Sequence, residues 1–259
     1  MKEIQIGPNE AGQRLDKLLK KYLKEAPGSF LYKMLRKKNI VLNGKKATGS
    51  EKLAEGDSVK LFLADETIGK FTGSPQSTKG QCFDEQKATD ISFSVVYEDQ
   101  ELLLLNKPEG LLSQKAKKGD ISVADQVVQY LVQTGSLTSA QLETFTPSIC
   151  NRLDRNTSGL IAAGKSLAGL QRMGELLQNR TLEKYYLCIV KGKITQPEHL
   201  KGYLKKDSRT NQVTISKRGD GEAQAIETEY MPIAWQDQMT LLKVHLITCL
   251  LYTSPSPRD

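Results

Sequence analysis

Arg152-Leu153-Asp154-Arg155-Asn156-Thr157-Ser158-Gly159-Leu160 is the stretch on which the interpretation of this chain depends. An acid, two guanidinium groups, two hydroxyls and a glycine are typical of a turn that presents its side chains. The alternative is a plain surface turn, in which Asp154 caps a helix and both arginines are solvated. The stretch alone does not separate these two interpretations.

The segments on both sides of this stretch predict a mixture of strands and helices. Short apolar runs rich in β-formers indicate strands, and apolar residues at spacings of three and four indicate helices. The predicted strands are residues 93–97, 102–105, 148–150, 160–163, 181–192 and 241–248, and the predicted helices are residues 123–132 and 166–177. Residues 91–248 are therefore expected to form one α+β domain.

Positive charge is concentrated in the first quarter of the chain. Residues 1–64 hold 14 Lys and Arg against 7 Asp and Glu, whereas the remaining residues hold 23 of each. Such an excess in one module indicates a polyanionic partner. The alternative is that these lysines only keep a small helical unit in solution.

The same first quarter has a clear pattern of elements. Residues 13–24 predict an amphipathic helix, because apolar residues recur at helical spacing and lysines take the other faces. Ser29 is a candidate N-cap for a second helix over residues 30–38. Asn43-Gly44 predicts the turn of a tight hairpin, and residues 58–63 alternate as a strand.

No signature of a metal, a nucleotide cofactor or a membrane span stands out. The four cysteines are widely spaced and the chain has 2 histidines, which supports neither a zinc site nor a disulfide framework. The glycine patterns of phosphate-binding and dinucleotide-binding loops are missing. From these two observations we expect neither a metal nor a cofactor. Because no apolar run has the length of a bilayer span, we also expect a cytoplasmic protein that does not bind a membrane.

Together with Asn151, the stretch from Arg152 to Leu160 resembles the signature of the RluA-type pseudouridine synthases, His-Arg-Leu-Asp-x-x-Thr-Ser-Gly-Leu. Asn151 stands where the family usually has His. Residues 106–110, Asn-Lys-Pro-Glu-Gly, and residues 184–192 resemble two further family segments. The resemblance implies an RNA isomerase with a mostly antiparallel catalytic sheet and Asp154 as the catalytic aspartate. On pattern alone Lys107 is equally well an exposed turn lysine, but the family packs this segment against the catalytic loop.

The resemblance also implies roles for neighbouring residues. Isomerisation breaks the bond from uridine N1 to ribose and rejoins the base through C5, so a carboxylate must lie beside C1′ of a flipped-out uridine. Tyr186, and not Tyr185, matches the tyrosine that stacks on the base, although either ring is compatible with simple packing on a strand. Arg152 and Arg155 would bind phosphate or fill the vacated stack. The implied catalytic residues are Asp154, Tyr186 and Arg152, and the implied substrate-binding residues are Arg155, Thr157, Ser158, Gly159 and Lys107.

Residues 13–64 resemble an S4 RNA-binding domain, because two helices are followed by a basic hairpin and Arg14-Leu15-Asp16 opens the first helix. The resemblance implies contacts mainly to phosphate, which give affinity and salt dependence but little sequence discrimination. The implied RNA-binding residues are Arg14, Lys33, Arg36, Lys37, Lys38, Asn43, Lys45 and Lys46. Family members with this domain mostly act on large-subunit ribosomal RNA, so we expect 23S ribosomal RNA as substrate and partner, and a monomeric protein.

Two segments lack sustained periodicity. Residues 65–90, with their glycines and serines, predict a flexible linker. Residues 249–259 follow a family strand that normally continues into Gly-Arg-x-His-Gln-Ile-Arg, and we interpret them as an anomalous tail on an incomplete catalytic domain, with a natural disordered tail as the alternative. In the family the arginine of that motif pairs with the catalytic aspartate, so the chain is expected to be poorly stable and weakly active or inactive.

Two other classes of function are alternatives. A noncatalytic RNA-binding or ribosome-assembly protein would keep the S4-like module and lack the chemistry, which the intact stretch from Arg152 to Leu160 argues against. A glycosidase or base-excision enzyme built on Asp154 would need a second placed carboxylate, and no partner acid is evident in the sequence.

Overall fold

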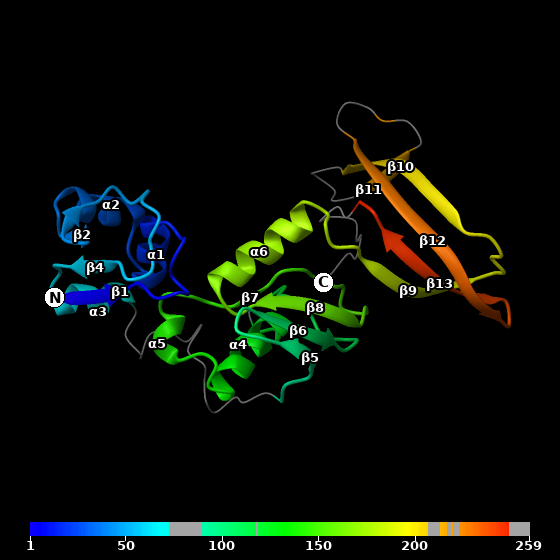
Figure 1. Cartoon of the computed structure of the whole chain (residues 1–259), viewed down its shortest axis with the longest axis horizontal. Coiled ribbons are helices and arrows are strands. Elements are labelled where there is room, and N and C mark those ends of the chain that lie inside the picture. Colours follow the sequence, from blue (N-terminus) through cyan, green and yellow to red (C-terminus); the bar gives the residue numbers. More distant parts are fainter. Residues whose placement is uncertain (73–89, 118, 207–212, 217–218, 220–222, 249–259) are drawn as a thin grey trace. The chain divides into compact units, whose positions relative to one another are not determined.

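The structure, a computed structural model, describes residues 1–72, 90–117, 119–206, 213–216, 219 and 223–248 (Figure 1). The chain divides into two compact units, Met1–Gly174 and Glu175–Asp259. This division differs from the predicted domain boundaries at 13–64 and 91–248. Residues 73–89 of the predicted linker, which was expected over residues 65–90, and the anomalous tail at residues 249–259 lie outside the described residues.

The N-terminal part of the first unit packs two helices, α1 (Leu15–Tyr22) and α2 (Gly28–Arg36), with an antiparallel sheet in the order β1-β4-β2-β3. The strands are β1 (Lys2–Gln5), β2 (Ile40–Leu42), β3 (Lys45–Lys46) and β4 (Ser58–Leu61). Leu15, Leu18 and Leu19, which share the predicted apolar face of α1, are fully buried in the core. Burial of each such side chain contributes about 1.5–3 kcal/mol, so this face holds the helix on the sheet.

The hairpin between β2 and β3 turns at the predicted dipeptide. Asn43 and Gly44 have φ angles of 51° and 73°, the pair of positive values that a type I′ turn requires. The Asn43 side chain also holds β4, because its Oδ1 accepts the Ser58 N–H at 2.8 Å and its Nδ2 donates to the Asp57 carboxylate at 2.8 Å. The side-chain amide of Asn43 is thus engaged within the module itself.

Two predictions for this part need correction. Residues 65–72 do not open the linker but form helix α3 (Asp65–Thr72), because the Ile68 side chain is buried in the same core. Ser29 is not an N-cap, since α2 already begins at Gly28. Pro27 takes that place, with its fixed φ and with its carbonyl accepting the N–H of Phe30 at 2.9 Å.

The N-terminal part contacts the segment that follows the short helix α5 (Ser139–Leu142). The Thr144 hydroxyl donates to the buried carboxylate of Glu10 at 2.6 Å. The Lys21 ammonium lies 5.2 Å from the centroid of the Phe145 ring, and burial lowers the pKa of Lys21 to about 8. These contacts join residues from both sides of the predicted linker into one compact unit.

The rest of the first unit is an antiparallel sheet in the order β5-β6-β8-β7. Its strands are β5 (Ser94–Glu98), β6 (Leu102–Lys107), β7 (Ser148–Ile149) and β8 (Gly159–Gly164), and helix α4 (Val123–Gln133) shares their core. Strand β6 pairs with β8 from Leu102 opposite Gly164 to Lys107 opposite Gly159. The end of β6 therefore lies beside the loop that enters β8.

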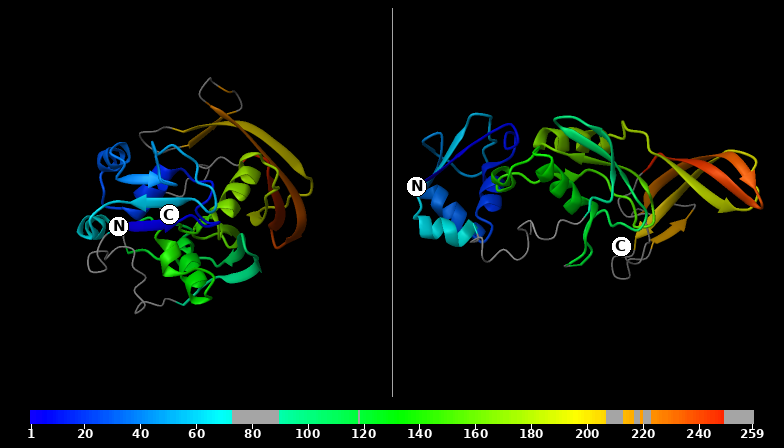
Figure 2. Two further views of the ribbon diagram at one scale, coloured as in Figure 1. Left: turned by 60° about the vertical axis from the view of Figure 1, so that its left-hand side comes forward. Right: turned by 90° about the horizontal axis from the view of Figure 1, so that it is seen from below.

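The second unit is one antiparallel sheet in the order β11-β10-β12-β13-β9, and its long strands curve along their length (Figure 2). Helix α6 (Leu167–Gln178) contains the division between the units. The strands are β9 (Tyr185–Lys191), β10 (Glu198–Lys206), β11 (Val213–Ser216), β12 (Gln224–Gln236) and β13 (Met239–Leu246). The named strands pair antiparallel throughout, which confirms the prediction of a mixed chain with antiparallel sheets. Within the described residues, no helix combines the length and the apolar character that a bilayer span requires.

Candidate active site

The loop that carries Asp154 connects β7 to β8. The Thr157 N–H donates to the Asp154 carbonyl at 3.0 Å, which closes a turn directly after the aspartate. Asp154 and Thr157 are half-buried, whereas Arg152 and Arg155 are exposed. The loop therefore shelters the carboxylate-bearing residue between two solvent-accessible guanidinium groups.

Gly159 ends this loop at the first position of β8. Its φ of +132° lies in a region that side-chain-bearing residues rarely adopt. A Cβ at this position would lie 3.7 Å from Leu153 Cδ1, an ordinary contact distance. The backbone angle, and not a lack of space, therefore demands glycine here.

Lys107 is fully buried at the end of β6, so the alternative of an exposed turn lysine is wrong. Its ammonium donates to three carbonyl oxygens, those of Pro108 at 2.9 Å, Leu111 at 2.8 Å and Arg155 at 3.0 Å. The Arg155 carbonyl also accepts the N–H of Gly110 at 2.8 Å. Lys107 thus ties the turn after β6 to the residue that follows Asp154.

Asn151 fixes the start of the loop to β8. Its Oδ1 accepts the N–H of Ala162 at 2.8 Å and its Nδ2 donates to the carbonyl of Leu160 at 3.2 Å. This structural contribution was not predicted from the sequence. The available signal was a side chain with both a donor and an acceptor, standing at a strand end where the family usually has His.

Tyr186 lies on β9 and belongs to the second unit, whereas Asp154 belongs to the first. Exposure alternates along β9, with Tyr185 exposed and Tyr186 half-buried, because successive side chains of a strand point to opposite faces. The two tyrosines therefore serve different faces of the sheet.

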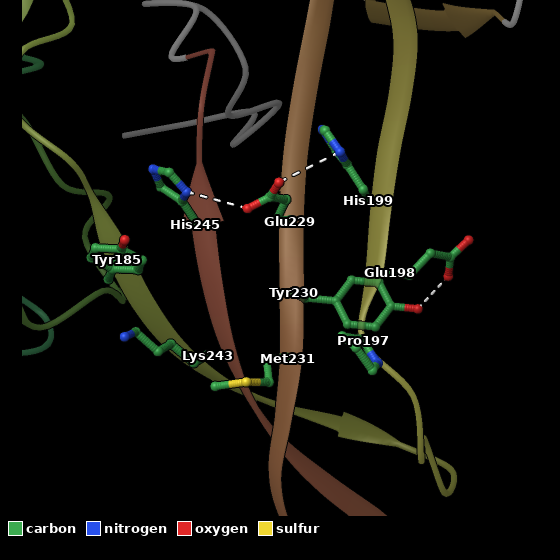
Figure 3. A pocket seen from close by; sticks show the side chains of 9 residues that line it. All are labelled: Tyr185, Pro197, Glu198, His199, Glu229, Tyr230, Met231, Lys243 and His245. Atoms are coloured by element: carbon green, nitrogen blue, oxygen red, sulfur yellow. Dashed lines mark hydrogen bonds and ion pairs between the residues drawn. The ribbon is translucent and has the colours of Figure 1, made fainter.

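Tyr185 lines a pocket of about 460 Å³ in the second unit (Figure 3). Figure 3 shows Glu229 of β12 between two histidines, with one carboxylate oxygen 3.5 Å from His199 Nδ1 and the other 3.6 Å from His245 Nδ1. The His245 ring stacks on Tyr185 at a centroid distance of 4.7 Å, and the Lys243 ammonium lies 4.2 Å from the centroid of the same ring.

None of the predicted site residues lines this pocket. Its histidines and carboxylates do not amount to a metal centre, because across the described part of the chain no group of three or more His, Cys, Asp or Glu side chains is placed to hold an ion. The predicted loop, and not the pocket, therefore remains the candidate active site.

The predicted RNA-binding residues of the N-terminal part are exposed. Arg14 is also tied down, since its guanidinium donates to both oxygens of the buried Asp16 carboxylate at 3.0 and 3.1 Å, and the Tyr32 hydroxyl donates to the same group at 3.0 Å. Burial pushes the pKa of Asp16 up, but the hydrogen bonds from Tyr32 and Arg14 hold it below its usual value. Arg14 is thus held in place at the N-terminus of α1.

The sequence matches a family model described as RNA pseudouridylate synthase over residues 101–249. The "Ribosomal large subunit pseudouridine synthase C" of Vibrio cholerae is 30% identical over 189 residues, 73% of this chain and 55% of that protein. The protein of the same name from Escherichia coli K12 is 29% identical over 225 residues, 85% of this chain and 65% of that protein. The solved structure of "Human RNA Pseudouridylate Synthase Domain Containing 1" aligns with a TM-score of 0.49 and 16% identity over 62% of each chain.

The matched region contains both the loop of Asp154 and the segment of Lys107, and it extends over more than half of the chain. The chain belongs to the RNA pseudouridylate synthase family. It spans 55% and 65% of the length of these two relatives.

Proposed function

We propose that the protein converts uridines of RNA to pseudouridine, with Asp154 as the catalytic carboxylate. The observation that supports this role best is the support of its loop, in which the backbone after Asp154 is held by the buried Lys107 ammonium while the aspartate remains half-buried. A reacting carboxylate must be held in one geometry beside its target atom, and such support restricts it.

The reaction balances without an oxidant or a second substrate. The N1–C1′ bond breaks, a C5–C1′ bond forms, the hydrogen on C5 leaves as a proton and N1 gains one. Asp154 would act beside C1′ on a uridine flipped out of its stack. Tyr186 would stack on the flipped base, while Arg152 and Arg155 would contact phosphate and Thr157, Ser158 and Gly159 would shape the loop around the nucleotide.

We infer that the substrate is large-subunit ribosomal RNA, because the names of the relatives refer to the large ribosomal subunit and its RNA is the part that contains uridines. The N-terminal part would act as an S4-like RNA-binding module. Its support is the excess of positive charge in residues 1–64 and the exposure of the basic side chains of α2 and the β2–β3 hairpin. With this substrate, the protein would act in the cytoplasm and as a monomer.

The experiment that tests this function uses RNA labelled with tritium at uridine C5. Protein in excess over ribosomal RNA allows even a weak activity to be measured in a single turnover. We expect tritium to appear in water without free uracil. Release of free uracil would instead indicate a glycosidase, and RNA binding without tritium release would indicate a noncatalytic binding protein.

A further inference from the structure

Ser113 contacts the residue directly before Asp154. Its hydroxyl donates to the Leu153 carbonyl at 2.6 Å and accepts the Leu153 N–H at 3.0 Å. A serine hydroxyl has one proton to donate, and the short distance to the Leu153 carbonyl indicates where that proton points. One buried side chain therefore holds both backbone polar groups of Leu153.

Ser113 is itself anchored to a helix of the core. The Leu112 carbonyl accepts the N–H of Val123 at 2.8 Å, and the Ser113 carbonyl accepts the N–H of Ala124 at 3.2 Å. The first N–H groups of a helix have no partner within the helix, so these two contacts satisfy donors of α4 that need one. Because Val123 is fully buried in the core, Ser113 is tied to a rigid element.

Asp154 is thus held from both sides by the segment that runs from the last residue of β6 to the start of α4. Ser113 holds the residue before the aspartate, and Lys107 and Gly110 together hold the carbonyl of the residue after it. We call Lys107, Gly110 and Ser113 the Asp154 clamp. With both neighbours fixed, the backbone of Asp154 has little freedom to rotate.

We propose that Ser113 is a positioning residue for the reaction, which fixes the Leu153 backbone and thereby the direction of the Asp154 carboxylate. This inference rests on the proposed function. Ser113 touches no reacting atom. Its effect is on the saturating rate and not on RNA affinity, because a misplaced carboxylate still allows the RNA to bind.

The test compares Ser113→Ala with Ser113→Thr, which keeps the hydroxyl, in the full chain. Ser166→Ala is the matched control, because the Ser166 hydroxyl is also buried and accepts the N–H of Gly169 at 2.9 Å at the start of α6. Two quantities are measured: amide exchange at Leu153 by NMR, and single-turnover tritium release over a range of protein concentrations.

Ser113→Ala is expected to accelerate exchange of the Leu153 amide and to lower the saturating rate about 10- to 100-fold, as displacements near 1 Å do. The protein concentration at half saturation is expected to stay unchanged. Ser113→Thr restores the rate, and Ser166→Ala keeps it within about twofold of the parent chain.

Several results would overturn the inference: a saturating rate in Ser113→Ala equal to that of the parent chain, a loss confined to RNA affinity, unchanged exchange at Leu153, or an equal loss in Ser166→Ala. If the parent chain releases no tritium, the proposed function is contradicted. If the Leu153 amide still exchanges faster in Ser113→Ala in that case, the contact between Ser113 and Leu153 is nevertheless supported.

Discussion

Replacement of Lys107 by methionine removes the ammonium from the Asp154 clamp and keeps a side chain of similar length. Three carbonyls lose this donor, but that of Arg155 keeps the N–H of Gly110. A buried acceptor left without a partner costs about 1–3 kcal/mol, so the carbonyls of Pro108 and Leu111 together account for roughly 2–6 kcal/mol. Removing a buried charge offsets part of this loss, so we expect a net loss of roughly 2–4 kcal/mol in the free energy of unfolding.

The loss is measured by urea denaturation, followed by circular dichroism in the far ultraviolet. The control is Lys117→Met, since Lys117 is an exposed lysine of the same unit. We expect the control to stay within about 0.5 kcal/mol of the parent chain, as surface substitutions usually do. If Lys107→Met is as stable as the control, the three hydrogen bonds of the Lys107 ammonium contribute nothing net to stability, contrary to this prediction.

Three further predictions concern other parts of the first unit. Gly159→Ala forces a side-chain-bearing residue to a φ of +132°, so the free energy of unfolding measured by urea titration should fall by about 1–3 kcal/mol. An unchanged free energy of unfolding would mean that the loop relaxes freely. Burial lowers the pKa of Lys21 to about 8 in the folded chain, against 10.5 when unfolded, so the unfolded state holds more protons between these values and stability should rise with pH there. Lys21→Met should flatten the rise of stability with pH, and a variant with the same pH profile as the parent chain would contradict this effect of Lys21. Replacing Arg36 and Lys37 together by alanine should reduce the slope of log affinity for RNA against log salt by about 0.7–0.9 per residue, and the same slope in variant and parent would exclude contacts to phosphate.

Much of the first unit could be predicted from the sequence, because its elements depend on local patterns. The apolar spacing of Leu15, Leu18 and Leu19 identified α1, and Asn43-Gly44 identified the hairpin. Helix α3 could not be found this way, because it contacts the core mainly through Ile68, which is buried, and Phe71, which is partly buried, within a segment of loop-like composition.

The candidate site was predictable in part for the same reason. The stretch around Asp154 could be recognised as a string of residues, and the structure gives it the form of a turn between two strands. The surroundings of Lys107 and of Ser113 depend on contacts across 48 and 40 positions of sequence, from the end of β6 and the segment after it to the loop before β8. The one available hint for Lys107 was its place two residues after a run of four leucines, which indicates a strand that a core must bury.

The proposed function requires above all that the carboxylate of Asp154 carries the reaction. The most direct measurement is single-turnover tritium release by Asp154→Asn, which keeps the size of the side chain and removes its charge. We expect the saturating rate to fall at least about 1,000-fold, with the urea midpoint and RNA affinity unchanged. An Asp154→Asn variant that releases tritium at the rate of the parent chain would contradict a catalytic role of this carboxylate.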